Sequence, residues 1–344
     1  MRESTFLKAC RREPTAYTPI WLMRQAGRYM AEYRAVRERM SFLELCHHPE
    51  TAAEVTVTAA RRLGVDAAII FADILLVLEP LGVGLEFTKG DGPTIGSPVR
   101  SPRQVDALSA YDTADRLSFV YDAIRHTRAE LTEIPLIGFA GAPFTLSSYL
   151  IEGGGSRNYE ATKRFMYEQE THWHRLMELL ANLVNSYLHA QVDAGADALQ
   201  LFDSWVGCLA PIDYRRFVAR HTTAALRGLS ERVPVIHFGT GTSGMLRELR
   251  DAGGDVIGAD WRIPLDDAWS RIGHDRAIQG NLDPVTLFAP TDTIARAAED
   301  ILDRAGGRPG HIFNLGHGIL PTTPVDHVRF LIDHVREASS RKRE

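Results

Sequence analysis

The chain has 344 residues, of which 44% are hydrophobic and 24% are charged, as in a globular protein with a large core rather than a disordered chain. Its net charge of -5, from 39 basic and 44 acidic residues, argues against a nucleic-acid-binding protein. No apolar segment reaches the roughly 20 residues that span a membrane, and the N-terminus lacks the apolar stretch of a signal peptide. The cysteines Cys10, Cys46 and Cys208 form no metal-binding pattern, so we expect a cytoplasmic protein with no membrane contact and no bound metal.

Short apolar runs recur along the chain, each followed by a glycine or a polar residue and then by a helical pattern. Such runs are typical of parallel strands that are buried on both faces, and the intervening segments have the pattern of amphipathic helices. Eight such units predict an α/β fold, a (β/α)8 TIM barrel formed by residues 1–344 as a single domain with extra helices and loops. An open doubly wound sheet is the structural alternative. The predicted strands are 20–23, 67–71, 135–140, 198–202, 234–238, 256–259, 277–280 and 312–315.

Two connections, between the second and third and between the third and fourth predicted strands, are longer than one crossover helix needs. We therefore expect extra helices or loops in them. Residues 78–102 are rich in glycine and proline, which predicts a loop or a small hairpin. The glycine run 153–155 lacks the phosphate-binding pattern GxxxxGK[ST] and is interpreted as a flexible loop.

Polar residues directly after the predicted strands are the candidates for a functional site, because the functional face of such a barrel lies at the carboxyl ends of its strands. We predict that these residues converge on one rim. They are Arg24, Gln25, Arg28, Asp73, Thr145, Ser147, Ser148, Tyr149, Asp203, Ser204, Asp260, Asn281, Asp283 and His317.

Arg24 and Arg28 carry planar guanidinium groups, which bind carboxylates or phosphates through two parallel hydrogen bonds. An alternative is that they pair with acids of the chain itself, such as Asp203 or Asp260. Gly27 between the two arginines indicates a backbone that comes close to another group. An acidic ligand is therefore favoured.

Asp73 directly follows an apolar run, and His317 lies between two glycines in the sequence NLGHGI. A carboxylate at such a position is either a catalytic group or a partner for a nearby arginine, and the histidine is a ligand contact, a general acid or base, or a capping group. Few of the 13 histidines follow a predicted strand, and neither a GxSxG elbow nor a strand-end lysine is present. The candidate site thus consists of arginine, carboxylate, hydroxyl and histidine side chains. Such a set suits a polyanionic substrate that is itself chemically reactive.

Six segments, in order over nearly the whole chain, resemble the uroporphyrinogen decarboxylase family. They are PIWLMRQAGRYMAEYR, FADILLVLEPLG, GFAGAPFTLSSYLIEGGGS, LQLFDSW, QGNLDP and NLGHGI. The resemblance implies a homodimeric carboxy-lyase of haem biosynthesis that uses neither a metal nor an organic cofactor. It implies that the enzyme removes carbon dioxide from the four acetate side chains of uroporphyrinogen III and yields coproporphyrinogen III. The eight carboxylates of that substrate account for Arg24 and Arg28, and its pyrrole ring, once protonated, serves as the electron sink.

The resemblance also implies roles for individual residues. Asp73 is expected at the centre of the macrocycle, where it accepts hydrogen bonds from the pyrrole N–H groups and stabilises the cation formed on ring protonation. Arg24 is a candidate for delivering the ring proton, through a bound water or a substrate carboxyl, because an arginine is itself a poor acid. The hydroxyls of Tyr149 and Ser204 and the imidazole of His317 are expected to orient the acetates or propionates of the substrate. Phe202 is expected to form an apolar wall against the ring. The predicted catalytic residues are Arg24, Arg28, Asp73, Tyr149 and His317, and the predicted substrate-binding residues are Arg24, Gln25, Arg28, Asp73, Tyr149, Phe202, Ser204 and His317.

Two alternatives stand beside this prediction. Zinc-dependent methyltransferases of the same superfamily need a His-x-Cys pair, and here VIHFGTG has Gly239 where that cysteine would fall. A tetrapyrrole carrier without catalytic activity has no need of a central carboxylate such as Asp73. The resemblance has one departure, since the loop FGTGTSG contains no lysine where some family members carry a basic residue.

Overall fold

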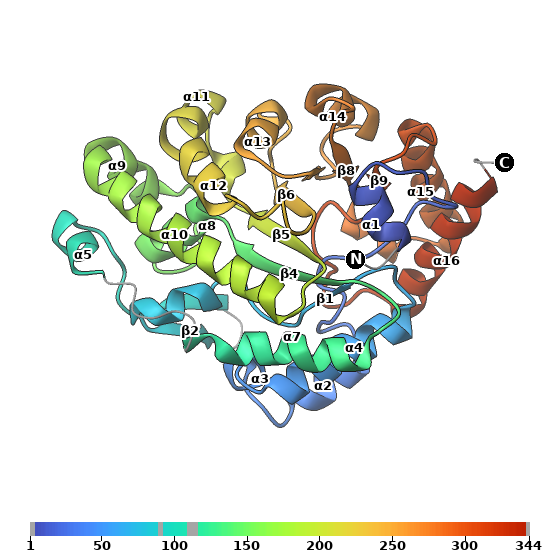
Figure 1. Ribbon diagram of the computed structural model, residues 1–344, viewed down its shortest axis with the longest axis horizontal. Helices are drawn as coiled ribbons and strands as arrows, with labels where there is room; N and C mark the ends of the chain where they lie inside the picture. Colours follow the sequence, from blue (N-terminus) through green and yellow to red (C-terminus); the bar gives the residue numbers. More distant parts are fainter. Residues whose placement is uncertain (1–3, 89–91, 109–115, 342–344) are drawn as a thin grey trace.

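The computed structural model describes residues 4–88, 92–108 and 116–341, and its centre is a curled parallel sheet of seven strands (Figure 1). The strand order is β1-β4-β5-β6-β7-β8-β9, so each strand pairs with the next one along the chain. The α/β class is confirmed. The strands are β1 (Ala68–Ile69), β4 (Leu136–Gly141), β5 (Ala198–Asp203), β6 (Val235–Gly239), β7 (Val256–Gly258), β8 (Ala277–Gln279) and β9 (His311–Ile312).

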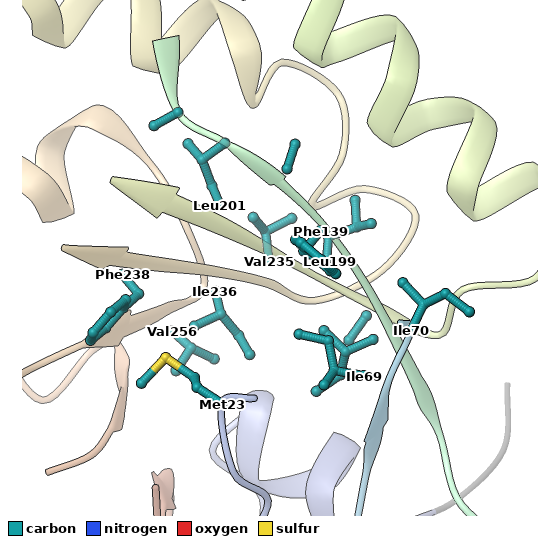
Figure 2. Packing of buried hydrophobic residues seen from close by; sticks show 14 of the residues in the cluster. Met23, Ile69, Ile70, Phe139, Leu199, Leu201, Val235, Ile236, Phe238 and Val256 are labelled. Atoms are coloured by element: carbon teal, nitrogen blue, oxygen red, sulfur yellow. The ribbon is translucent and has the colours of Figure 1, made fainter. Parts of the chain in front are cut away.

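These strands are apolar because both faces of the sheet are covered. Every residue of β4 and of β6 is buried, which is why each had appeared in the sequence as a continuous apolar run. Figure 2 shows Met23, Ile69, Leu199, Ile236 and Val256, from successive segments of the chain, packed in one cluster. The core continues from the sheet to the helices that cover it, where Trp173 and Leu331 are buried in the same cluster.

The first predicted strand, 20–23, is not a regular strand. Ile20 forms a single parallel bridge with Phe313, and the Phe313 N–H donates to the Pro19 carbonyl at 2.8 Å. On the other side the Asp66 N–H donates to the Ile20 carbonyl at 2.9 Å. The Gln25 N–H then donates to the Leu22 carbonyl, and this turn ends the extended segment. Seven of the eight predicted strands are thus present. The remaining one, 20–23, forms only a bridge, and we call it the bridging segment.

Helices surround the sheet, and the two long connections contain the extra elements that the sequence predicted. The helices are α1 (Thr5–Cys10), α2 (Ala31–Arg37), α3 (Phe42–Cys46), α4 (Pro49–Leu63), α5 (Pro102–Ala107), α7 (Ser118–Glu130), α8 (Pro143–Glu152), α9 (Glu160–Glu168), α10 (Glu170–Ala194), α11 (Pro211–Asp213), α12 (Ala219–Ala225), α13 (Leu246–Ala252), α14 (Leu265–Ile272), α15 (Thr291–Ala305) and α16 (Val325–Arg341). The shorter helical turns are η1 (Leu76–Leu81), η2 (Val206–Cys208), η3 (Tyr214–Val218) and η4 (Pro284–Phe288). None of the helices within the described residues has the length and apolar character of a membrane span.

The glycine-rich connection after β1 contains a hairpin. Strands β2 (Leu85–Thr88) and β3 (Gly92–Ile95) pair antiparallel, and residues 89–91 between them lie outside the described residues. The glycine run 153–155 lies outside the helices, as expected for a loop, and its first residue, Gly153, ends α8 with a φ of 88°. A left-handed glycine is a common end of a helix.

The long helix α10 is fixed to β4 by one buried side chain. Gln191 Oε1 accepts a hydrogen bond from the Phe139 N–H at 2.8 Å, and Gln191 Nε2 donates to the Phe139 carbonyl at 2.9 Å. The neighbouring Gly138 permits this contact, because a β-carbon there would lie 2.4 Å from Gln191 Oε1. The side chain thus satisfies both backbone groups of a strand residue.

We predict that Gln191→Leu destabilises the fold by about 1–3 kcal/mol, because the buried N–H and C=O of Phe139 lose their partners. Chemical denaturation of the two proteins measures the difference. Glu178→Leu is the control, since Glu178 is exposed on the same helix and its replacement should change stability by less than about 0.5 kcal/mol. Equal stability of the Gln191 variant and the wild type would contradict the prediction.

Candidate active site

The N-terminal segment carries Arg24 to the carboxyl end of the sheet. The Met23 N–H donates to Asn314 Oδ1 at 3.2 Å, and the Ile319 N–H donates to the Met23 carbonyl at 3.0 Å. Arg24 has a φ of 61°, a backbone conformation that residues other than glycine rarely adopt. Its side chain passes so close to Gly318 that a β-carbon there would lie 2.5 Å from Arg24 Cδ. Arg24 therefore lies beside the glycine that follows His317.

The internal acids do not pair with Arg24 or Arg28. Asp260 is bonded to Arg262 Nη1 at 2.6 Å, and Asp203 accepts from the Thr145 hydroxyl at 2.9 Å. Arg24 and Arg28 are both exposed, and within the part of the chain that the structure describes neither forms an ion pair. Their guanidinium groups are thus open to an external anion.

Asp73 follows β1 and lies partly buried at the same end of the sheet. Its Oδ1 accepts a hydrogen bond from the Leu75 N–H at 2.9 Å. Desolvation raises the pKa of Asp73 to about 6, although the Leu75 N–H and the positive charge of Arg24 act to lower it. No ion pair is formed by Asp73 among the described residues. The carboxylate is therefore poorly solvated and has no cation bound directly to it.

Tyr149 is an aromatic side chain near Asp73, and other aromatic rings pack at the carboxyl ends of β4 and β5. Tyr149 on α8 stacks on Trp205, with ring centroids 3.7 Å apart. Phe202 meets Phe139 edge-on at 5.5 Å. Burial, and then the charge of Asp73, raise the pKa of Tyr149, so its hydroxyl keeps its proton at neutral pH. Tyr149 thus offers a hydrogen-bond donor on an otherwise apolar surface.

A buried network fixes Trp205, to which the sequence analysis gave no role. Asp203 is fully buried, and desolvation raises its pKa to about 7. The Thr145 hydroxyl donates to Asp203 Oδ1 and accepts from the Trp205 N–H at 3.3 Å. Asp203 therefore acts on Tyr149 indirectly, through Thr145 and Trp205. In the sequence, the one indication that Trp205 belongs to the site was its position two residues after the predicted strand-end acid Asp203.

His317 is held between two tightly packed glycines. A β-carbon at Gly316 would lie 2.5 Å from the backbone N of Trp261, and Gly318 packs on Arg24. Burial, and then the charge of Arg24, lower the pKa of His317, so the imidazole is neutral at physiological pH. Ser204 lies partly buried after β5, and its carbonyl accepts from the hydroxyl of Thr240.

Several further candidate side chains have internal partners, among them Ser147 and Ser148, whose hydroxyls both donate to the Phe144 carbonyl. Gln25 was predicted to contact the substrate, but its side chain is buried and bonds to the backbone of Leu22 and Ala67, both at 3.4 Å. Asn281 donates to the carbonyls of Asp260 and Ile263, and Asp283 caps η4. Their position next to a strand end did not reveal that these side chains bond to groups of the protein itself.

The soft ligands of a zinc site are missing. His237 is buried and hydrogen-bonds through Nδ1 to the Leu249 carbonyl, and Gly239 occupies the position two residues later. In residues 4–88, 92–108 and 116–341, no group of three or more His, Cys, Asp or Glu side chains is arranged to hold a metal ion.

Comparison with known proteins gives the family. The uroporphyrinogen decarboxylase family profile matches residues 1–338. The chain is 58% identical over 336 residues to the uroporphyrinogen decarboxylase of Chloroflexus aurantiacus, covering 96% of this chain and 95% of that protein. It is 54% identical over 338 residues to that of Carboxydothermus hydrogenoformans, covering 98% and 97% of the two chains. The chain belongs to the uroporphyrinogen decarboxylase family.

Two solved structures with low sequence identity to this chain share its fold. A methyltransferase from Methanosarcina mazei has a TM-score of 0.83 at 19% identity and covers 97% of each chain. A B12-independent methionine synthase from Shewanella has a TM-score of 0.58 at 13% identity and covers 85% of this chain and 86% of its own. These likenesses concern the fold alone.

We predict that Asp73→Asn stabilises the folded protein. The pKa of Asp73 is raised from 3.8 to about 6, so the folded state binds this proton more tightly than the unfolded chain does. Ionisation therefore lowers stability as the pH rises from about 4 through 6, and above that the full cost of up to about 3 kcal/mol is present. The uncharged asparagine has no such cost.

Denaturation of the two proteins at about pH 5 and at about pH 8 tests this linkage. The stability gain of the Asp73 variant should be larger at the higher pH. Asp267→Asn, at an exposed site, is the control for the effect of the same substitution at the surface. A gain that is the same at both pH values, or a loss at the higher one, would show that desolvation does not dominate at Asp73.

Proposed function

We propose that the protein converts uroporphyrinogen III to coproporphyrinogen III in haem biosynthesis, releasing four molecules of carbon dioxide. It is then a carboxy-lyase acting on the acetate side chains and leaving methyl groups. The observation that carries the proposal is the 58% identity to the Chloroflexus aurantiacus uroporphyrinogen decarboxylase over 96% of the chain. A partly buried carboxylate, Asp73, near the exposed Arg24 supports it.

The proposed chemistry uses the substrate itself as the electron sink, so we propose that no cofactor takes part. A pyrrole carbon next to the acetate-bearing carbon accepts a proton, and the ring becomes a cation. The bond to the carboxylate then breaks, carbon dioxide leaves, and the electron pair neutralises the ring. A second proton adds to the exocyclic carbon, and the ring loses the first proton. Each step thus replaces one carboxylate by one hydrogen without oxidation or reduction.

Asp73 has the central role in this proposal. Its carboxylate accepts hydrogen bonds from the pyrrole N–H groups and stabilises the ring cation, and poor solvation strengthens both effects. Arg24 and Arg28 bind substrate carboxylates, and Arg24 lies close enough to influence the pKa of both Asp73 and His317. We therefore propose that Arg24 positions the group that protonates the pyrrole ring, which is a bound water or a substrate carboxyl.

The remaining contacts orient the substrate. The protonated hydroxyl of Tyr149 and the neutral imidazole of His317 donate hydrogen bonds to side-chain carboxylates, with Ser204 as a further hydroxyl. Phe202 faces the ring as an apolar wall. Gln25 is reassigned to a supporting role, because its side-chain partners are backbone groups of the protein.

We also propose that the bridging segment completes a (β/α)8 barrel, so that residues 1–344 form one catalytic domain. The hydrogen bonds that this segment makes both to Phe313 and to Asp66 support the proposal. A homodimer in the cytoplasm is proposed from the family resemblance. Light scattering after size-exclusion chromatography measures the number of subunits, and a monomeric mass would contradict the dimer.

An anaerobic assay of chelator-treated protein with chemically reduced uroporphyrin III tests the reaction. We expect products with seven, six, five and finally four carboxylates, separated by chromatography. Binding without conversion would indicate a carrier. Activity that requires added zinc and a methyl-corrinoid would indicate a methyltransferase.

In the same assay, Asp73→Asn should lower turnover about a hundred- to a thousand-fold, which corresponds to the loss of about 2.7–4 kcal/mol of transition-state stabilisation. The side chain keeps its size and its hydrogen-bond acceptor but loses its charge. Asp267→Asn is the matched control and should turn over at the wild-type rate. Near-normal turnover of the Asp73 variant would remove Asp73 from the centre of the mechanism.

A further inference from the structure

Arg262, just beyond β7, is an arginine that the sequence analysis did not consider. Its Nη1 lies 2.6 Å from Asp260 Oδ2, and its backbone N–H donates to Asp260 Oδ1 at 3.0 Å. Its guanidinium lies over the ring of Trp261, 4.0 Å from the centroid. The carboxylate is almost fully buried, whereas the Arg262 side chain is 50% exposed. The guanidinium is thus anchored at one nitrogen and has a solvent-facing side.

Two contacts place Arg262 at the candidate active site. The Gly241 N–H donates to the same Asp260 oxygen, also at 2.6 Å, so the guanidinium lies at the loop after β6. This loop, FGTGTSG, contains no basic residue of its own. Trp261 packs on Gly316, which precedes His317, just as Arg24 packs on Gly318, which follows it. Arg24 and the Trp261–Arg262 pair therefore flank His317.

The free donors of Arg262 favour a role beyond the support of Asp260. Asp260 already accepts hydrogen bonds from two backbone N–H groups, those of Gly241 and Arg262. Among the described residues, Nε and Nη2 of Arg262 have no hydrogen-bond partner. A guanidinium that is held by a carboxylate and an aromatic ring loses little freedom when it binds an anion. The charge of Arg262 also contributes to the lowered pKa of His317, in agreement with a position near that imidazole.

We propose that Arg262 binds a side-chain carboxylate of the substrate, as a third guanidinium beside Arg24 and Arg28. This inference rests on the proposed function, because it requires a substrate with several carboxylates. Arg262 lies on the far side of His317 from Arg24, so the two arginines contact different carboxylates. Asp260 is then a positioning residue, which fixes Arg262 and ties it to the loop after β6.

The test compares the wild type with Arg262→Gln and Arg262→Lys in the anaerobic uroporphyrinogen III assay. In the glutamine variant we expect KM to rise about tenfold or more with kcat within about twofold, as for a contact made equally in the ground and transition states. KM should also depend less steeply on salt concentration, because one charge contact is lost. The lysine variant keeps the charge but not the paired N–H donors of the guanidinium. Its KM should therefore lie between those of the wild type and the glutamine variant.

Arg250→Gln is the matched control. Arg250 also bonds to an aspartate, Asp275, at 2.6 Å, but it lies on α13 and makes none of the contacts that place Arg262 beside His317. Its KM and salt dependence should equal those of the wild type. Thermal denaturation shows whether each variant folds, so that a change in KM can be assigned to binding. If the glutamine variant does not fold, the KM of the lysine variant is compared with that of the wild type.

The outcomes are distinguishable. Unchanged KM and unchanged salt dependence in both Arg262 variants, with a wild type that turns over, would overturn this inference and leave the proposed function in place. Lowered thermal stability without a change in KM would assign Arg262 to the support of Asp260 alone. Absence of turnover in the wild type would overturn the proposed function and this inference together.

Discussion

The hydrogen bonds of the bridging segment hold the candidate site together. The Pro19 carbonyl accepts from the Phe313 N–H, and the Ile20 carbonyl accepts from the Asp66 N–H, so the bridging segment is attached both to the residues after β9 and to the residues before β1. Trp21 adds a buried bond from its indole N–H to Gln279 Oε1 at 2.9 Å. Because the segment then turns at Arg24, a residue near the N-terminus comes to lie against the loop that carries His317. The bonds of Met23 to Asn314 and Ile319 continue this attachment up to Arg24.

Three carboxylates at strand ends have different surroundings, and these differences separate their roles. Asp260 has a bound guanidinium and two N–H donors, so it is a stable anchor. Asp203 has only the Thr145 hydroxyl on one oxygen, and it holds the network behind Tyr149. Asp73 has one backbone N–H and no directly bound cation. Asp203 is fully buried, whereas Asp73 is only partly buried, so Asp73 is the poorly satisfied carboxylate that a ligand with N–H groups can reach.

The sequence predicted the positions of the strands well, because strands buried on both faces leave continuous apolar runs. It did not predict that 20–23 forms only a bridge, since the turn at Arg24 depends on contacts with residues 314–319. The resemblance to a family selected Asp73 and the two arginines, but adjacency to a strand end cannot tell an inward side chain from an outward one. Gln25 was misjudged for this reason. Trp205 was missed because its stacking partner Tyr149 is distant in the sequence, and Arg262 because its position beside His317 depends on the contact of Trp261 with Gly316.

The arrangement of cations answers a difficulty that the proposed chemistry creates. A central carboxylate repels a substrate with eight carboxylates, and the chain as a whole has a net charge of -5. Binding therefore requires local positive charge that the overall composition does not supply. Arg24 is fixed by its contact with Gly318, and in the proposal Arg262 is fixed by Asp260, so both offer donors in nearly rigid positions. Their attraction for the outer carboxylates holds the macrocycle against the repulsion of Asp73. That repulsion turns into attraction when the ring is protonated, so the same carboxylate that weakens binding of the substrate favours the transition state.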